Sequence, residues 1–499
     1  MNMNDIDKGE FIIVSGSTGS GKTSFLRNVY EDLSNDKKVY YIFSNPNEKI
    51  IFTSPYNQIL YTMGQNSDIL YEAAEIFSFL GIENLFDKNV NEMSEGEKQL
   101  INIAIAILND PDILILDTPF SYIDPFYRDR IISILEKINK ELFISIIISE
   151  HDLNGLLELS NRLILIEKYN VIIDAEVRNV VTFLRNSQPE LLNLFPDYIK
   201  LYIELDGGKE YPLNVKEAAA WFDKVSLSVR DPMRKSIKSN EEIVIRIKNL
   251  SFSYGNDYVL KDINMKILKG SSNCIIGSNG AGKTTLIKLI SGLIKSYQGH
   301  IFLNDRNMKK YNNLYHDCIA LLPSNPKYLF VKERLEDDIK YMIDIHVKDK
   351  KDKEKVFENI ISEYDIKDLM NRTFDNLSFG QKQLAAIAKV MISNPKILIL
   401  DEPTKGLDYF CKEKLSYIIN HLKSKGITLV MVSHDMDFIA QNTDYCYFLF
   451  NHAIAFEGET NKFIINNKFY TTNIHNIVKK RLPNTINLKD IVDKWKPLC

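Results

Sequence analysis

The sequence reads GSTGSGKTS at Gly16–Ser24 and GSNGAGKTT at Gly277–Thr285. Both segments follow an apolar run and match the pattern GxxxxGK followed by Ser or Thr. Glycines let consecutive backbone N–H groups surround phosphate oxygens, and the helix that follows directs its positive end toward them. A tight strand–helix turn with an incidental lysine would explain one such segment, but not two in matched surroundings. Both segments are therefore predicted to bind the phosphates of a nucleotide.

The lysines and hydroxyl residues of these segments have separate expected roles. Lys22 and Lys283 are expected to reach the β- and γ-phosphates, while Thr23 and Thr284 ligate Mg²⁺. ATP and Mg²⁺ are therefore the predicted cofactors. The predicted nucleotide-binding residues of the two segments are Gly16, Ser17, Thr18, Gly19, Ser20, Gly21, Lys22, Thr23 and Ser24, and Gly277, Ser278, Asn279, Gly280, Ala281, Gly282, Lys283, Thr284 and Thr285.

Three further segments recur in the same order in both halves of the chain. MSEGEKQ, ILILDTPF and SEHD in the first half return as LSFGQKQ, ILILDEPT and SHD in the second. The same number of positions separates Ser94 from Asp117 and Ser378 from Asp401. The repeat unit is therefore a whole domain rather than a short solenoid module.

The two apolar runs that end in Asp117 and Asp401 differ at the next residue. A carboxylate at a strand end can hold Mg²⁺ or its water shell, although a lone aspartate there often caps the following helix. Glu402 follows Asp401, where it can polarise the attacking water, whereas Thr118 follows Asp117. Because a hydroxyl is a poor base at neutral pH, catalysis is predicted to depend on Glu402 and Asp401.

This ordered set resembles the ABC-type ATPase domain, found twice and covering nearly the whole chain. Each half has a phosphate loop (Walker A), an LSGGQ-like signature, an aspartate strand, a D-loop (YID at Tyr122–Asp124, GLD at Gly406–Asp408) and a switch histidine (His151, His434). The resemblance implies an α/β fold with two P-loop NTPase domains, each a mainly parallel sheet flanked by helices plus a helical subdomain. It also implies that both histidines contact the γ-phosphate, although a lone histidine is often a satisfied core residue.

Members of this family pair two domains head to tail, so that each nucleotide lies between one domain's phosphate loop and the other's signature. One implied site then contains Thr118 and the second signature, and the other contains Glu402 and the first. Glu95 alters the first signature and adds negative charge near the polyphosphate. Turnover is expected to be asymmetric and concentrated at Glu402; the competing interpretation is that Glu95 disables that site too. The signature residues expected to bind nucleotide are Ser94, Gly96, Ser378 and Gly380.

Other positions depart from the family pattern. Tyr254, in FSYGND, matches the aromatic that stacks on adenine, although a lone tyrosine is more often a packing residue. The first half begins only fifteen residues before its phosphate loop, so the corresponding strand and aromatic are missing there. The family's Q-loop glutamine, which links the nucleotide to a membrane subunit, is replaced in both halves. We assign its place to Thr53 and to Ser324.

The repeat also suggests domain limits. Residues 1–190 are predicted to form the first ATPase domain, truncated at its N-terminus and degenerate, and residues 191–242 its C-terminal helix and the linker. Residues 243–465 form the second predicted ATPase domain, and residues 466–499 a C-terminal helical tail.

Composition narrows the expected location. The chain has 499 residues, more than one hydrophobic core usually serves, and its net charge of −4 gives no overall attraction to nucleic acid. Its five cysteines form no CxxC pair, its start does not resemble a secretory signal, and no apolar run reaches the roughly 20 residues of a spanning helix. We therefore expect a cytoplasmic protein, held peripherally on the inner face of the cell membrane by a partner.

Two functions are compatible with these features. The chain most resembles the fused ATP-hydrolysing subunit of energy-coupling-factor importers, which take up vitamins or metal ions with a polytopic membrane subunit and a substrate-binding membrane protein. The alternative is a soluble tandem ABC ATPase that acts on ribosomes or nucleic acid. Such proteins usually carry a long basic linker and a catalytic glutamate in both halves, whereas this linker is short and Thr118 breaks the pattern. The importer is preferred, with no nucleic-acid partner.

Overall fold

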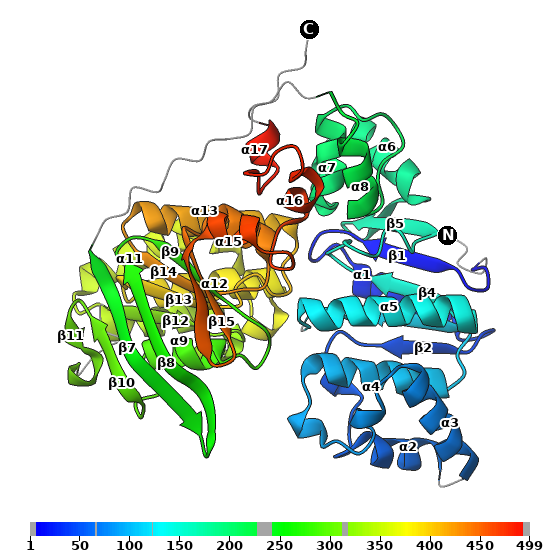
Figure 1. Cartoon of the computed structure of the whole chain (residues 1–499), viewed down its shortest axis with the longest axis horizontal. Helices are drawn as coiled ribbons and strands as arrows, with labels where there is room; N and C mark the ends of the chain where they lie inside the picture. Colours follow the sequence, from blue (N-terminus) through cyan, green and yellow to red (C-terminus); the bar gives the residue numbers. More distant parts are fainter. Residues whose placement is uncertain (1–5, 65–66, 122, 227–241, 312–317, 493–499) are drawn as a thin grey trace. The chain divides into compact units, whose positions relative to one another are not determined.

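The computed structural model describes residues 6–64, 67–121, 123–226, 242–311 and 318–492 (Figure 1). The chain divides into two compact units, Met1–Ala218 and Ala219–Cys499. Tyr122 of the expected D-loop and most of the expected linker lie outside the described residues. In the part of the chain that is described, no helix is both long and apolar enough to cross a membrane.

The first unit is an α/β domain, and α8 reaches the boundary with the second. Its strands and helices are β1 (Phe11–Ser15), α1 (Lys22–Leu33), β2 (Val39–Ile42), α2 (Pro55–Met63), α3 (Ser67–Phe79), α4 (Glu95–Leu108), β3 (Ile113–Asp117), α5 (Pro125–Leu142), β4 (Ser145–Ser149), β5 (Arg162–Glu167), β6 (Asn170–Ala175), α6 (Val177–Ser187), α7 (Asp197–Glu204) and α8 (Val215–Phe222).

These strands form one six-stranded sheet in the order β2-β3-β4-β1-β5-β6. All neighbours are parallel except β5 and β6. β1, β3 and β4 are buried along their whole length, which explains their nearly uninterrupted apolar sequences. Figure 1 shows α2, α3 and α4 grouped beyond β2. Because β1 and β3 run in parallel, the phosphate loop after β1 and the aspartate that ends β3 share one edge of the sheet.

The second unit repeats this arrangement and adds a second sheet. Its elements are β7 (Ile243–Tyr254), β8 (Asp257–Leu268), β9 (Ser272–Ile276), α9 (Lys283–Ile290), β10 (Gln298–Leu303), β11 (Arg306–Asn307), β12 (Ile319–Leu322), α10 (Leu335–His346), α11 (Lys350–Glu363), α12 (Phe379–Met391), β13 (Ile397–Asp401), α13 (Tyr409–Ser424), β14 (Thr428–Val432), α14 (Met436–Asn442), β15 (Tyr445–Phe450), β16 (Ala453–Glu459), α15 (Thr460–Asn466), α16 (Asn473–Val478) and α17 (Lys489–Val492).

The main sheet of the second unit has the order β12-β13-β14-β9-β15-β16, which matches the first unit strand for strand. The added sheet, β11-β10-β7-β8, is antiparallel. Among the described residues of the first unit, no strand corresponds to any of these four. The N-terminal truncation expected from the sequence stays a prediction, and the absence of counterparts of β10 and β11 among the described residues accounts for part of the shorter first half.

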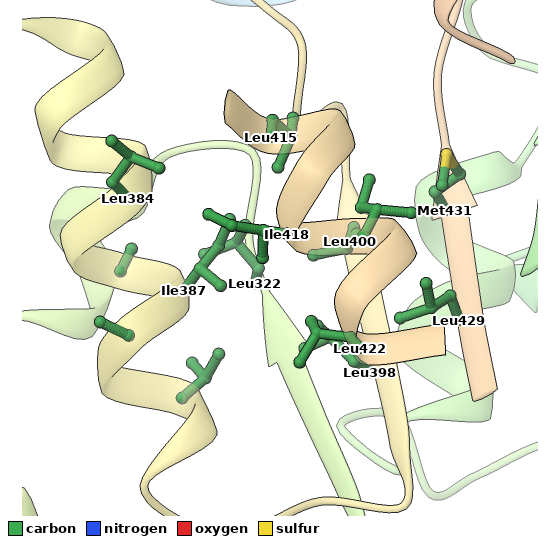
Figure 2. Packing of buried hydrophobic residues seen from close by; sticks show 14 of the residues in the cluster. Leu322, Leu384, Ile387, Leu398, Leu400, Leu415, Ile418, Leu422, Leu429 and Met431 are labelled. Carbon is green, nitrogen blue, oxygen red and sulfur yellow. The ribbon is translucent and has the colours of Figure 1, made fainter. Parts of the chain in front are cut away.

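Helices α12 and α13 cover one face of the main sheet in the second unit. Leu415, Ile418, Ile419 and Leu422 recur along α13 at helical spacing and are all buried. Figure 2 shows side chains of α12, α13, β12, β13 and β14 converging in this core. The same layered packing holds β13 in place, and with it the aspartate at its end.

Candidate nucleotide-binding sites

Each phosphate loop is held in a curve by its own lysine. In the first unit the ammonium group of Lys22 donates hydrogen bonds to the carbonyl oxygens of Gly16 (2.8 Å) and Ser17 (3.0 Å). Lys22 is buried, and it begins α1 directly after Gly21, whose φ of 104° lies in the left-handed region. The loop therefore brings a cation to the start of a helix, where anions bind favourably.

The second unit repeats this geometry closely. Lys283 is buried and donates to the carbonyl oxygens of Gly277 (2.8 Å) and Ser278 (2.9 Å). The threonines that follow the two lysines, Thr23 and Thr284, are both exposed. An exposed threonine thus follows a buried lysine in each unit, and this residue pair suits the binding of a phosphate-bound cation.

The aspartate that ends β13 has an unusual environment. Asp401 is 5% exposed, and its Oδ1 atom has no hydrogen-bond partner. Burial, and then the neighbouring Glu402, raise the pKa of Asp401 to about 6. A buried carboxylate oxygen without a partner is costly unless a cation binds there. The donor set of Asp401 and Thr284 therefore fits Mg²⁺, which prefers oxygen ligands.

The corresponding aspartate in the first unit is already hydrogen-bonded. Asp117 accepts a hydrogen bond from Ser149 Oγ at 2.8 Å and another from the Tyr41 hydroxyl at 3.1 Å. Burial and the nearby Asp117 raise the pKa of Tyr41 well above its usual value. In the second unit the residue paired with the aspartate on the next strand is Val432, which has no hydroxyl to offer. The two units therefore differ in how readily their aspartates can receive a cation.

Thr118 and Glu402 occupy the same backbone position. Both have positive φ angles, 43° and 49°. The N–H of Thr118 donates to the carbonyl oxygen of Ser149 (3.0 Å), and that of Glu402 to the carbonyl oxygen of Val432 (2.9 Å). The backbone conformation is therefore the same, and the units differ in the side chain and in a second hydrogen bond, which the Thr118 N–H donates to Ser149 Oγ at 2.9 Å.

The two histidines have different partners. In the second unit His434 Nε2 lies 3.1 Å from Glu402 Oε1, so the structure brings together the two residues predicted to act there. In the first unit His151 Nδ1 lies 3.5 Å from the ammonium nitrogen of Lys22. His151 is therefore beside the phosphate loop, but the carboxylate that accompanies His434 is absent at position 118.

The signature serines begin the helices that follow them. Ser94 caps α4 and Ser378 caps α12, each in a capping box with the residue three positions later. Gly96 and Gly380 lie on the first turns of these helices, where a Cβ atom would clash with Tyr127 and Cys411, respectively. Each signature is thus held at a helix N-terminus by side-chain caps and by close packing.

Glu95 does not present an uncompensated charge. Its carboxylate forms an ion pair with Lys98 at 3.0 Å and accepts a hydrogen bond from the Asn47 side-chain amide at 3.0 Å. Lys98 also donates to the Asn47 oxygen, so the three side chains form a closed group. The cation reduces the repulsion that Glu95 alone would exert on a polyphosphate.

The structure corrects the Q-loop position in the first half. Ile42 at the end of β2 pairs with Leu116, as Leu322 at the end of β12 pairs with Leu400. The second residue after each strand is therefore Ser44 in the first unit and Ser324 in the second, so the assignment to Thr53 is wrong. Thr53 lies in the segment before α2, where its carbonyl oxygen accepts a hydrogen bond from the Val90 N–H.

A repeated tripeptide could have revealed this register. Ser44 and Ser324 each begin the sequence Ser-Asn-Pro. In both copies the asparagine side chain caps the short helix that follows. The apolar run IIF at residues 50–52 resembles a strand end, and for this reason the sequence alone favours Thr53.

Glu150 is a residue of the first site that the sequence patterns did not single out. It is buried, and its carboxylate accepts hydrogen bonds from the N–H groups of Phe120 (2.9 Å) and His151 (3.1 Å). Burial raises its pKa to about 7. Ser433 takes this place in the second unit and hydrogen-bonds Thr404 across the same loop. Comparison of SEHD with SHD after strand alignment would have shown the substitution.

Tyr254, the expected adenine-stacking aromatic, lies at the end of β7. Its ring is 58% exposed and makes an edge contact with Phe252 at a centroid distance of 4.8 Å. The next strand, β8, lies beside the second phosphate loop, because Val259 would contact a Cβ atom on Gly282 at 3.0 Å. Tyr254 is therefore exposed on a hairpin that borders this loop.

Comparison with known proteins gives consistent results. The sequence model of the family described as "ABC transporter" matches residues 2–121 and 260–405. A protein of Clostridium tetani (strain Massachusetts / E88), provisionally named an ABC transporter ATP-binding protein, is 30% identical over 445 residues, which cover 88% of this chain and 97% of the relative. A protein of Bacillus subtilis (strain 168), provisionally named the HMP/thiamine import ATP-binding protein YkoD, is 22% identical over 486 residues, 91% of this chain and 87% of that protein.

Among solved structures, the archaeal ribosome recycling factor aABCE1, in its complex with the ribosomal stalk protein aP1, has a TM-score of 0.57. The match covers 88% of this chain and 83% of that one at 21% identity, and it concerns the fold alone. The family match extends over just over half of the chain, and the same ordered motifs occur in both units. The chain therefore belongs to the ABC transporter family and carries two of its ATPase domains in tandem.

Proposed function

We propose that this chain is the ATP-hydrolysing subunit of an ABC-type membrane importer, with Glu402 as its main catalytic residue. The observation that carries the proposal is the pair of Glu402 and His434 at 3.1 Å, beside the buried Asp401 with its unpaired oxygen. ATPase domains of this family bind and hydrolyse ATP, so a carboxylate at this strand end has a direct use. It would orient the attacking water and accept its proton.

The other residues of the second unit would hold the triphosphate. Lys283 would turn part of its hydrogen bonding from the loop carbonyls to the phosphates, and Thr284 and Asp401 would hold Mg²⁺. When bound, Mg²⁺ neutralises charge on the phosphate oxygens. His434 would keep the Glu402 side chain in place and contact the terminal phosphate. Phosphoryl transfer requires little more than such positioning and charge stabilisation.

The first unit is proposed to bind ATP but to turn it over slowly. Thr118 offers no carboxylate, and both oxygens of Asp117 already accept hydrogen bonds. The ion pair between Glu95 and Lys98 supports the view that the altered signature remains usable. The head-to-tail pairing of the two domains around their nucleotides stays a prediction.

Transport is proposed from the relatives. ABC ATPases work with membrane subunits, and the name of the relative YkoD refers to thiamine import. The partners would be a polytopic membrane subunit and a substrate-binding membrane protein, with a vitamin or a metal ion as cargo. They would hold the chain peripherally on the inner face of the cell membrane.

Replacement of one side chain tests the catalytic assignment. Glu402→Gln is expected to lower the ATP turnover of the full chain by at least about 100-fold, because general-base catalysis contributes on the order of 10² to 10⁴. Binding of a fluorescent ATP analogue should stay nearly unchanged. The matched control is Thr118→Val, at the same backbone position, which should keep turnover within about twofold of the wild type. Wild-type turnover in Glu402→Gln would refute the assignment.

Co-purification tests the transport assignment. The tagged Glu402→Gln chain, incubated with ATP to retain the bound state, is purified from detergent-solubilised membranes and from the ribosomal fraction. A polytopic membrane protein should accompany it in near-equal amount. Ribosomal proteins in its place, with the chain missing from the membranes, would favour the soluble alternative.

A further inference from the structure

The glycine before each phosphate-binding helix is covered by a different element in the two units. In the second unit a Cβ atom on Gly282 would lie 3.0 Å from both Cγ1 and the carbonyl oxygen of Val259, on β8. The turn between β15 and β16 packs against the same strand, because Lys261 N–H donates to the carbonyl oxygen of His452 at 2.8 Å. The hairpin that carries Tyr254 therefore covers both the glycine and the turn.

The first unit lacks this hairpin among its described residues, and a tyrosine lies against the corresponding glycine instead. Tyr169 lies in the turn between β5 and β6, the counterpart of the turn that holds His452. A Cβ atom on Gly21 would lie 2.6 Å from Cδ1 and 3.2 Å from Cγ of Tyr169. The N–H of Tyr169 donates to the carbonyl oxygen of Ser20 at 2.7 Å. The ring is thus fixed against the start of α1.

The ring remains open on its other side. Tyr169 is 75% exposed, although its ring lies against Gly21 and its N–H binds the buried Ser20. Its φ of 64° and that of Lys168, 50°, belong to the left-handed region, which bulky residues rarely adopt and which glycine or asparagine prefers in such turns. The corresponding turn of the second unit has the same left-handed backbone at Asn451 and His452, so the aromatic ring, and not the turn geometry, distinguishes Tyr169.

The loop beside this ring is tied to the same strand. Ser17 Oγ donates a hydrogen bond to Glu167 Oε2 at 2.6 Å, and Glu167 ends β5 just before the turn. Two hydrogen bonds, Ser17 to Glu167 and Tyr169 to Ser20, consequently fix the phosphate loop relative to the turn that carries the ring. A nucleotide whose phosphates bind the loop would have its base within reach of an exposed aromatic face.

We propose that Tyr169 is the stacking platform for the base of the nucleotide bound in the first unit, whose described residues include no hairpin like the one that carries Tyr254. The proposal rests on the proposed binding of ATP by the first phosphate loop. Aromatic rings stack on bases with little regard to their hydrogen-bonding edges. The first site therefore accepts purine nucleoside triphosphates with less discrimination between ATP and GTP than a site that reads base edges.

The test isolates the first site within the full chain by Lys283→Ala, which weakens the second loop. Calorimetry then measures the binding of ATP, of GTP and of tripolyphosphate, which has no base. Tyr169→Ala is expected to weaken ATP and GTP binding by about 5- to 100-fold and to leave tripolyphosphate binding unchanged. Tyr169→Trp should retain nucleotide affinity. Tyr169→Gly, whose backbone suits the turn, should show the same loss as Tyr169→Ala and so separate stacking from folding.

The outcomes distinguish a failure of nucleotide binding in the first unit from a failure of the stacking role of Tyr169. If the Lys283→Ala chain binds neither ATP nor tripolyphosphate, the first loop is not a nucleotide site, and both the proposed function of that unit and the role of Tyr169 fail. If it binds both ligands, and Tyr169→Ala and Tyr169→Gly bind ATP as tightly as the parent, only the stacking role is overturned. Loss of tripolyphosphate binding in parallel with ATP would likewise overturn it, because the tyrosine would then support the loop rather than the base.

Discussion

At the residue scale, equivalent backbone positions in the two units carry different chemistry. Thr118 and Glu402 share a positive φ and the same hydrogen bond to the neighbouring strand. In the first unit a carboxylate is found instead at Glu150, buried and bonded to two backbone N–H groups. This carboxylate stabilises the loop after β3 and is not placed as Glu402 is placed.

The environment of Glu150 makes the stability of the first unit depend on pH. Its pKa is raised from about 4.5 to about 7, so the folded state keeps the proton when the unfolded state has lost it. The free energy of unfolding should therefore fall between about pH 4.5 and about pH 7, by about 3 kcal/mol for this group. Glu150→Gln should remove this part of the decline. Urea unfolding at pH 5 and pH 8 measures it, with the exposed Glu141→Gln as control; an unchanged slope in Glu150→Gln would contradict the expectation.

At the scale of elements, each signature helix is locked to the helix that follows the aspartate strand. α4 approaches Tyr127 on α5 at Gly96, and α12 approaches Cys411 on α13 at Gly380. Neither glycine has a positive φ, so glycine is needed at these positions because the neighbouring helix leaves no space for a Cβ atom. The close approach fixes the signature relative to the strand that ends in Asp117 or Asp401.

Enlarging one of these glycines tests the close approach. Gly380→Ala should destabilise the second unit by about 1–3 kcal/mol, because its Cβ would clash with Sγ of Cys411. Adding Cys411→Ala should restore most of the loss, since the sulfur is then gone. Denaturant unfolding of the single and double variants measures the coupling, with Cys411→Ala alone as control. Equal stability of Gly380→Ala and the parent would show that the helices have room to move apart.

At the scale of the whole molecule, the same architecture occurs twice, but the two units differ in the sheets that they contain. Both units have the same order of six strands, and only the second has the antiparallel sheet among the residues described. Ile115 and Ile399 occupy corresponding positions two residues before the aspartates and belong to separate hydrophobic clusters. Each unit thus has its own core.

Separate cores should confine the effect of a core substitution to one unit. Ile115→Ala and Ile399→Ala should each cost about 2–5 kcal/mol, through lost burial and the cavity left behind. Hydrogen exchange followed by mass spectrometry should show faster exchange in β3 and β4 for the first variant and in β13 and β14 for the second. Faster exchange throughout the chain in both variants would indicate one cooperative core.

The sequence alone determined the features whose causes are local. Glycines followed by Lys-Thr specify a phosphate loop, Ser followed three residues later by Glu or Gln specifies a capped helix, and apolar runs specify buried parallel strands. Repetition of these elements in one order led to the family and to two domains. The contrast of Thr118 with Glu402 was also readable without a structure, because both follow the same pattern.

Only the tertiary structure decided the contacts between distant segments. Strand pairing identified Ser44 rather than Thr53, and it brought Ser149 and Tyr41 to the oxygens of Asp117. It also put Tyr169 against Gly21, far away along the chain. No local pattern encodes such pairs, because they depend on which strands are neighbours and on the register between them. A shift of one residue would turn each side chain to the other face of the sheet.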